Sequence, residues 1–125
     1  MKLLAILAIS LGAQVASAEV TIMEAHKAVT IDCAKDPEVN LVGNHIKATL
    51  TGTCKKVTAT GNHENVIGSV TSAFVAGNHN VFDLDGVDAI SIAGNHNTVN
   101  YKKPLAKKKT AVSNVGKYNK VNRVK

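Results

Sequence analysis

The chain has 125 residues, a formal net charge of +6 and an aromatic content of 3%, with two Phe, two Tyr and no Trp. This length suits a single domain, and a conventional β-sandwich of this size would depend on aromatic side chains that are scarce here. The composition therefore predicts a core of Val, Ile, Leu and Ala, which suits a narrow and regularly stacked interior.

The first 18 residues have the features of a secretory signal peptide. Lys2 supplies a positive charge, residues 3–15 form an apolar run, and Ala16, Ser17 and Ala18 are small residues suited to cleavage. A membrane-spanning helix needs about 20 apolar residues, and this run is shorter. We therefore expect residues 1–18 to be removed after Ala18, with export to the periplasm or the exterior and no transmembrane segment.

Charge divides unevenly over the rest of the sequence. Residues 19–101 contain five Lys and nine acidic residues, a net charge of −4, whereas residues 102–125 contain eight Lys and one Arg without an acid, a net charge of +9. We expect residues 19–101 to form a repeat domain and residues 102–125 to form a Lys-rich C-terminal extension with a degenerate last repeat. The basic character belongs to this extension.

A Gly-Asn-His tripeptide recurs through the middle of the chain at nearly constant spacing. It begins at Gly43, Gly61, Gly77 and Gly94, with intervals of 18, 16 and 17 residues, and a degenerate copy begins at Gly116. Apolar residues stand four and two positions before most of these glycines, which is the period of a strand with one buried face. Gly and Asn favour a turn because both tolerate positive φ. Each copy therefore predicts a strand, a corner and a second strand.

A unit of about 17 residues cannot bury its own apolar face, but stacked units can. The repeat therefore predicts an all-β fold, a small single-domain parallel β-solenoid of about five rungs, where a rung is one turn of the chain. Residues 20–31 are expected to form a cap before the first rung. An ordinary antiparallel sandwich is the alternative, and the near-constant spacing argues against it.

Cys33 and Cys54 are the only cysteines. An even pair in an exported protein favours a disulfide over a two-thiolate metal site. Cys33 lies ten residues before Gly43 and Cys54 lies seven before Gly61, so removing a three-residue insertion around Pro37 gives both the same position in a rung. Neighbouring rungs, about 4.8 Å apart, would hold the pair at a distance that a disulfide bridges.

Residues 29–101 resemble a bacterial exported family called domain of unknown function 3060. The resemblance rests on the two cysteines, on the Val-x-Ala-x-Gly-Asn-His pattern, and above all on the sequence DGVDAISIAGNHNTVNY at residues 85–101. It implies an exported β-solenoid domain and brings no catalytic residues, because none are established for the family. The Lys-rich segment after Tyr101 departs from the family's pattern.

Four histidines take the same corner position in successive copies and are the sharpest candidates for chemistry. They are His45, His63, His79 and His96. Stacked imidazoles could bind Zn, Cu or Ni, and this metal site is the alternative to a protein without cofactors. A straight row converges poorly on one ion, because a tight site needs three or four ligands at one point. A polar corner residue is therefore the simpler interpretation.

The Gly and Asn of each corner are predicted to be structural, because every copy places them in a turn. These residues are Gly43, Asn44, Gly61, Asn62, Gly77, Asn78, Gly94 and Asn95. Stacked Asn side chains can hydrogen-bond from rung to rung. Asp83, Asp85 and Asp88 lack the spacing of a calcium loop, so we expect a solvated corner with an Asp-Gly turn at these residues.

The C-terminal extension is a candidate for polyanion binding. Its first basic residues are Lys102, Lys103, Lys107, Lys108 and Lys109. Such a charge block favours acidic lipid headgroups or an anionic envelope polymer, whereas export and the few aromatic residues disfavour nucleic acid. The alternative is a solvated basic cap on the last rung. Self-association through open end rungs is a further hypothesis.

Common catalytic motifs are missing from the sequence, which has no Gly-x-Ser-x-Gly, no His-Glu-x-x-His and no repeated pair of carboxylates. We therefore predict a non-enzymatic structural or binding protein of the cell envelope. It would present a repeated solenoid surface to an anionic polymer or to another envelope protein. Metal binding through the histidines is the second hypothesis, and a carbohydrate-active enzyme is the third.

Overall fold

The computed structural model describes residues 19–124, so the predicted signal peptide lies outside the described residues. Strands make up the regular structure of this part of the chain. They are β1 (Glu19–Ile22), β2 (Ala28–Asp32), β3 (Glu38–Leu41), β4 (Lys47–Ala59), β5 (Asn65–Val75), β6 (Val81–Ile92), β7 (Thr98–Lys103), β8 (Ala111–Asn114) and β9 (Lys120–Arg123). Between residues 19 and 124, no helix is long and apolar enough to cross a membrane.

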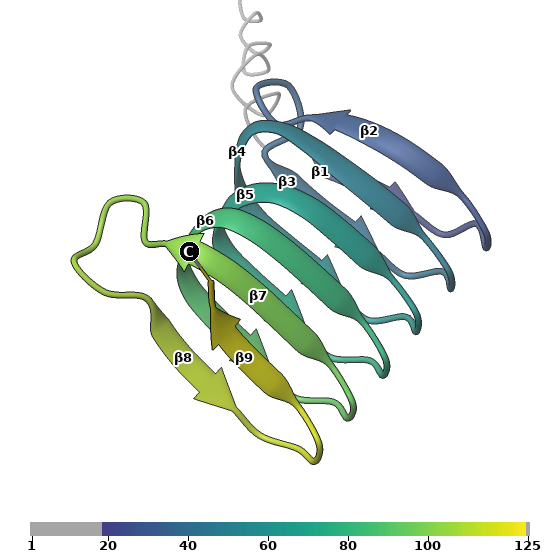
Figure 1. The fold of residues 1–125 in the computed structure, drawn as a ribbon. Coiled ribbons are helices and arrows are strands. Elements are labelled where there is room, and N and C mark those ends of the chain that lie inside the picture. Colours follow the sequence, from purple (N-terminus) through teal and green to yellow (C-terminus); the bar gives the residue numbers. More distant parts are fainter. Residues whose placement is uncertain (1–18, 125) are drawn as a thin grey trace, which may run out of the picture.

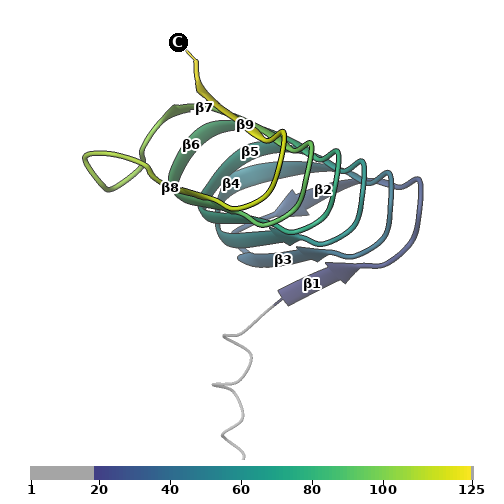
Figure 2. The ribbon, with the colours of Figure 1, turned by 90° about the horizontal axis from the view of Figure 1, so that it is seen from below.

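The described strands pair in parallel, and the chain winds into a solenoid of about six turns (Figures 1 and 2). Each rung runs along one face, turns at a corner and returns along the opposite face. One face stacks β1, β3, the second halves of β4, β5 and β6, and then β8. The other face stacks β2, the first halves of these three strands, β7 and β9. The predicted all-β parallel solenoid is confirmed.

The first rung shows that the predicted cap was wrong, and it raises the number of rungs from about five to about six. β1 pairs with β3, and β2 pairs with β4, so residues 19–32 form a complete turn of the solenoid. Glu24 and Ala25 stand in place of Gly and Asn, which hides this corner in the sequence. His26 nevertheless has a φ of 56°, close to that of the later corner histidines.

The core consists of short apolar columns between the two faces. Val39, Val57, Ala73 and Ile90 lie in register on successive rungs, and all four are buried. Phe82 is among the largest fully buried side chains. A one-residue slip of any strand would turn its apolar side chains outward, so the core fixes the register. The corner residues of successive rungs are stacked in register for the same reason.

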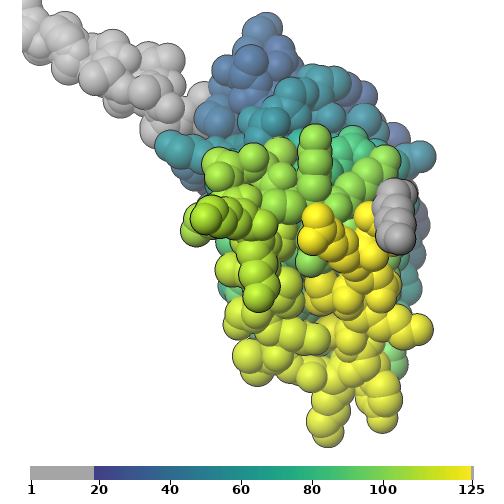
Figure 3. All heavy atoms as spheres, turned by 60° about the vertical axis from the view of Figure 1, so that its left-hand side comes forward, coloured from purple at the N-terminus to yellow at the C-terminus, as the bar shows by residue number. Residues whose placement is uncertain are grey.

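The last rung is built from the degenerate repeat. β8 pairs with β6 and β9 pairs with β7, so the solenoid continues through Arg123. Val112 lies in register with Ile90, yet it is 45% exposed because β8 belongs to the last rung within residues 19–124. In Figure 3 this end of the molecule faces the viewer, with the last strands in yellow and yellow-green. The backbone of this rung is an open sheet edge.

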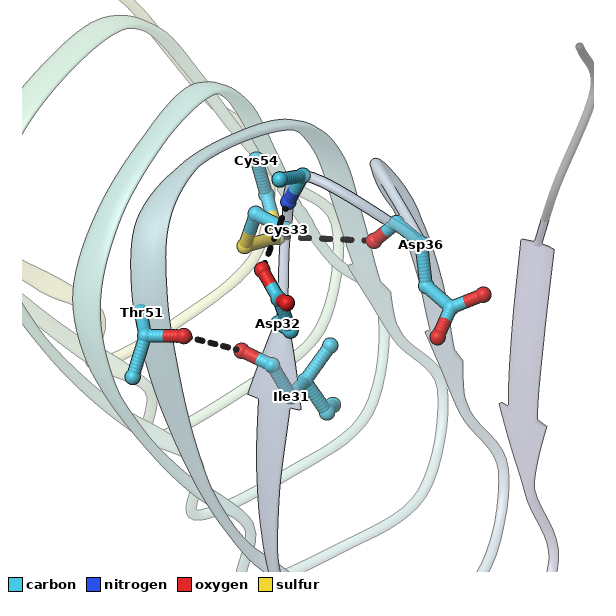
Figure 4. Close-up of a disulfide and its surroundings, with 7 residues drawn as sticks. Ile31, Asp32, Cys33, Asp36, Thr51 and Cys54 are labelled. Atoms are coloured by element: carbon cyan, nitrogen blue, oxygen red, sulfur yellow. Dashed lines mark hydrogen bonds between the residues drawn. A yellow bond between two sulfur atoms is a disulfide. The ribbon is translucent and has the colours of Figure 1, made fainter.

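A disulfide joins Cys33 to Cys54, as predicted, and links the bends that follow the first two corners (Figure 4). The two Cα atoms are 4.7 Å apart, and both side chains are buried. The backbone is joined at the same place, because the amide of Cys33 donates to the carbonyl of Thr51. The disulfide therefore closes the N-terminal end of the core covalently.

Candidate functional site

The Gly-Asn-His corners stack so closely that glycine is required at their first position. A Cβ atom at Gly61 would lie 1.7 Å from the carbonyl oxygen of Gly43, and a Cβ atom at Gly77 would lie 1.7 Å from that of Gly61. We expected positive φ at the Gly and Asn of each corner, but it occurs at the histidines, for example 59° at His45 and 58° at His63. The glycines thus serve close backbone approach, and the histidines make the turn.

The Asn column, formed by Asn44, Asn62, Asn78 and Asn95, joins successive corners. The side-chain Oδ1 of each of the first three accepts a hydrogen bond of 2.9–3.0 Å from the backbone amide of the next Asn, and Asn95 accepts one from the amide of Lys117. We expected contacts between side-chain amides, but the donors are mainly backbone groups. Since each Oδ1 already accepts a hydrogen bond within the stack, the Nδ2 groups are the main donors left for a ligand, although Nδ2 of Asn62 also donates to Oδ1 of Asn44 at 3.4 Å.

A second set of polar residues, absent from the sequence predictions, lies inside the corners. Asn80, Asn97 and Asn119 form this inner column, in the fourth position of their corners. Each side chain accepts from the backbone amide of the preceding rung and donates to a glycine carbonyl of an earlier rung. The repeated Gly-Asn-His-Asn of residues 77–80 and 94–97 was the signal that could have identified them.

Glu64 stands at the inner-column position in the corner that begins at Gly61. Its side chain is 1% exposed, and Oε2 accepts a 2.9 Å hydrogen bond from the amide of Gly61. Oε1 is buried and has no hydrogen-bond partner among residues 19–124. Burial raises the pKa of Glu64 to about 7, against the smaller, lowering effect of the Gly61 hydrogen bond. This carboxyl group therefore changes its charge near neutral pH.

The His column comprises five stacked imidazoles, from His26 to His96. The ring centroids of successive histidines are 4.7–5.0 Å apart, and their planes are within 8° of parallel. Tyr118 extends the stack, with its ring 4.9 Å from that of His96. The sequence identified His45, His63, His79 and His96, and the structure brings all four together. The sequence did not identify His26 and Tyr118 as members of the stack, because their corners lack the full tripeptide.

Parallel stacking directs the ring nitrogens of neighbouring histidines along parallel lines. Tight metal sites need nitrogen donors that converge on one point about 2.0–2.1 Å away. Among residues 19–124, no group of three or more His, Cys, Asp or Glu side chains could hold a metal ion. The observed arrangement does not favour a shared Zn, Cu or Ni ion, and metal binding stays a prediction that titration with these ions can test.

A shallow groove of about 730 Å³ runs along the solenoid beside the two columns. It is lined by the His column and the Asn column, by Ala25 at the first corner, and by Lys117 and Tyr118 at the last. Imidazole edges and amide groups thus repeat along the groove at each rung. Among the lining residues that the structure describes, Lys117 is the one lysine or arginine, and none carries a carboxylate.

The Lys-rich loop, residues 104–110, connects β7 to β8 and projects from the body (Figures 1 and 2). The amides of Leu105, Ala106 and Lys107 all donate to the carboxylate of Asp88, at 2.7–3.2 Å. Thr110 closes the loop by donating from Oγ1 to the carbonyl of Val87 at 2.7 Å. Both ends of the loop are therefore fastened to β6.

Asp88 corrects the prediction of a solvated acidic corner. Asp88 is only 3% exposed, because the Lys-rich loop covers it. It lies within β6 and not in a turn. Desolvation raises the pKa of Asp88, but the three loop amides and the charge of Lys107 outweigh it, so the pKa lies below its usual range. Asp83 and Asp85 stay exposed, and Asp85 pairs with Lys102 at 3.3 Å.

The basic residues gather at the C-terminal end of the solenoid. Lys102 and Lys103 end β7, whereas Lys107, Lys108 and Lys109 lie in the Lys-rich loop and are exposed. Lys117, Lys120 and Arg123 follow on the last rung. The structure therefore brings the predicted polyanion-binding lysines together at one end, around a loop whose base is held by Asp88.

Residues 64–118 match the model of a family described as "Protein of unknown function (DUF3060)". The predicted resemblance to this family is confirmed over residues 64–118. The matched segment extends past residue 101, so it includes the Lys-rich loop, which was expected to depart from the family's pattern. No curated protein and no solved structure matches the chain.

The segment that matches the DUF3060 model begins at Glu64, the buried carboxyl group, and ends at Tyr118, the last ring of the stack. It contains His79 and His96, the inner column up to Asn97, and Asp88 with the loop that it holds. The match to DUF3060 therefore covers the Lys-rich loop and the C-terminal half of the groove lining, and it assigns a role to neither surface.

Proposed function

We propose that the chain is a non-enzymatic, exported protein of the cell envelope that binds an anionic envelope polymer at its basic C-terminal end. The attachment of the Lys-rich loop to Asp88 carries the proposal. Because three amides hold the start of this loop, Lys107, Lys108 and Lys109 extend from a fixed base. A preorganised binding surface loses less conformational entropy on binding than a flexible tail does.

The charges around the loop support an anionic partner. Two ion pairs occur within residues 19–124, Lys27–Glu24 and Lys102–Asp85, and neither uses a lysine of the loop. The loop lysines are therefore available to an external anion. Anionic polymers are attracted to such a cluster over a distance set by ionic strength.

Export is supported by the buried disulfide of Cys33 and Cys54. Disulfides persist in oxidising compartments outside the cytoplasm and are rare inside it. This observation agrees with the signal peptide expected at residues 1–18, so the envelope is the compartment in which the basic end would meet its polymer.

The test compares the salt needed to elute the protein, residues 19–125, from an immobilised anionic polysaccharide. We expect Lys107→Gln/Lys108→Gln/Lys109→Gln to elute at clearly lower salt than the wild type, because each lost contact lowers the electrostatic part of binding. The matched control, Lys35→Gln/Lys47→Gln/Lys55→Gln, removes the same charge from exposed positions in the first half of the solenoid. Equal effects of the two triple variants would show that net charge, and not the loop, governs retention.

A further inference from the structure

The turn itself does not demand histidine at the third corner position. His26, His45, His63, His79 and His96 all adopt φ of 56–59°. Glycine adopts such a conformation most easily, and Asn, like His, visits it more readily than most side chains do. Five imidazoles in succession therefore place the same chemistry on every rung from the first to the fifth, at positions where a smaller residue would also make the turn.

The groove beside the His column is suited to anionic oxygen atoms. The Asn column presents amide Nδ2 donors, because its Oδ1 atoms accept from the backbone of the next corner. Lys117 adds a positive charge at the C-terminal end of the lining. The groove lining within residues 19–124 contains no carboxylate that would repel an anion.

The charged groups near the column leave its middle rungs free for an anion. Glu24 and Lys27 flank the first corner and pair with each other at 3.5 Å. Glu64 lies behind the corner of His63 and is buried, with Oε2 directed to the amide of Gly61. Lys117 and Tyr118 belong to the last corner. Acidic groups therefore stand at one end of the column or inside the corner, not along the groove.

Ring spacing couples anion binding to protonation. Histidine is the side chain that most commonly gains its charge just below neutral pH. Adjacent rings lie 4.7–5.0 Å apart, so protonation of neighbours brings like charges close together. A row of anions along the groove would relieve this repulsion, and by linkage the bound protein would take up protons.

The shape of the groove favours a linear polymer, and the stacking favours a polysaccharide over a nucleic acid. Ring faces within the column are covered by neighbouring rings, so they are closed to the base stacking that single-stranded nucleic acids use. The exposed ring edges and amides can hydrogen-bond to hydroxyl and carboxylate groups. An extended sugar unit is similar in length to the rung spacing of about 4.8 Å.

We propose that the groove formed by the His column and the Asn column is a binding site for a linear acidic polysaccharide, and that binding there is accompanied by proton uptake. The site lies at the corners of the solenoid, whereas the Lys-rich loop follows β7 at the opposite bend. The two proposals are therefore independent, and either can fail alone.

The experiment is calorimetric titration of the protein, residues 19–125, with polygalacturonate fragments at about pH 5.5 and about pH 7.5. Each titration is repeated in two buffers of different ionisation enthalpy, which measures the protons taken up. We expect affinity about tenfold higher at the lower pH, with net proton uptake, because protonated imidazoles attract the carboxylates. Equal affinity at both pH values, or binding without proton uptake, would overturn the proposal.

Variants test whether the protons taken up on binding are bound by the His column. His63→Asn/His79→Asn keeps residues that accept positive φ. Because two of the five stacked imidazoles are removed, this variant is expected to show clearly smaller pH dependence and proton uptake than the wild type. Glu64→Gln, which removes the buried group that titrates in the same range, is expected to retain it. The triple Lys→Gln variant of the loop is expected to keep the pH dependence and the proton uptake, because the loop lies outside the groove. Wild-type pH dependence in the His63/His79 variant would refute the site.

Two further measurements avoid reliance on a folded variant. Imidazole resonances of the wild-type protein, observed by NMR with and without polygalacturonate, should shift for several column histidines. Unchanged imidazole resonances on binding would place the ligand elsewhere. A single-stranded oligonucleotide that binds equally well, with the same proton uptake, would overturn the assignment to polysaccharide.

Discussion

The backbone amide of Glu64 donates a 2.8 Å hydrogen bond to the side-chain Oδ1 of Asn80 on the next rung. The two residues occupy the same position in successive corners, but only Asn80 has an amide group that can donate to a glycine carbonyl, at 3.1 Å. Glu64 can imitate that donor only when its carboxyl group is protonated. The inner column therefore contains one member whose fit depends on pH.

Glu64→Gln should make the protein more stable at neutral and higher pH. The pKa of Glu64 is raised from 4.5 to about 7. Between these values the folded state keeps a proton that the unfolded state has lost, so wild-type stability falls as pH rises through this range. We expect the variant to gain up to about 3 kcal/mol relative to the wild type between pH 4 and pH 8. Urea unfolding across this range measures the difference.

The comparison of the two proteins isolates Glu64, because every other ionisable group is present in both. Glu38→Gln serves as a matched control, since this residue is also a glutamate but is only partly buried at the start of β3. The same pH dependence in the wild type and in Glu64→Gln would show that the carboxyl group is not protonated in the folded state near neutral pH.

Loss of the disulfide should destabilise the protein without redirecting the fold. The bond closes a loop with a sequence separation of 21, and cross-links of this size stabilise by about 3 kcal/mol through the unfolded chain. Cys33→Ala/Cys54→Ala should lower the free energy of unfolding by about this amount. Reductant should produce a similar loss in the wild type and none in the variant. A reductant-insensitive wild type would contradict a disulfide in the protein.

A methyl group at Gly77 should prevent normal stacking of the corners. Its Cβ would lie 1.7 Å from the carbonyl oxygen of Gly61 and 3.1 Å from Nδ2 of Asn80. Relief requires backbone movement, so we expect Gly77→Ala to cost more than about 4 kcal/mol or to prevent folding. The control is Gly52→Asn, where the nearest atom is 3.9 Å away and φ is 78°, and it should cost about 1 kcal/mol. Circular dichroism and urea unfolding check both.

Removal of the Asp88 carboxylate should free the Lys-rich loop. The amides of Leu105 and Ala106 would lose their acceptor, so Asp88→Ala should increase the rate of tryptic cleavage after Lys107 to Lys109. Asp85→Ala removes an exposed acid from the same strand and should leave the rate unchanged. In the wild type, the low pKa of Asp88 means that its stabilising effect is present above the unfolded pKa and is lost in strong acid. Equal cleavage rates for all three proteins would show that the loop is not held by Asp88.

The architecture could be predicted because its determinants are local and repeated. Val57 and Ala59 precede Gly61 by four and two residues, and both are completely buried. Their alternation defines the inner face, and the tripeptide defines the corner. Parallel stacking then follows, since equivalent residues of consecutive repeats must share one core. Cys33 and Cys54 fitted this register with a single small insertion.

The features that escaped prediction depend on contacts between distant residues. His26 makes the first corner although Glu24 and Ala25 precede it, because pairing of β1 and β2 with later strands holds the turn in place. In the sequence, Asp88 has the pattern of a surface acid. Its burial depends on a loop that begins 17 residues further along the chain, whose amides donate to its carboxylate. The burial of Glu64 likewise follows from its place in the inner column, which the pattern of apolar residues in the sequence does not reveal.

Strand contacts connect each rung to the rungs directly above and below it. Nothing in such an arrangement fixes how many rungs there are, since the middle of the molecule presents the same two interfaces at every level. Duplication of one repeat of about 17 residues would lengthen the solenoid by about 4.8 Å and add one imidazole to the His column. The number of repeats therefore sets both the length of the groove and the number of imidazole edges along it. Related chains with more or fewer repeats would offer a longer or shorter groove with the same groups on each rung.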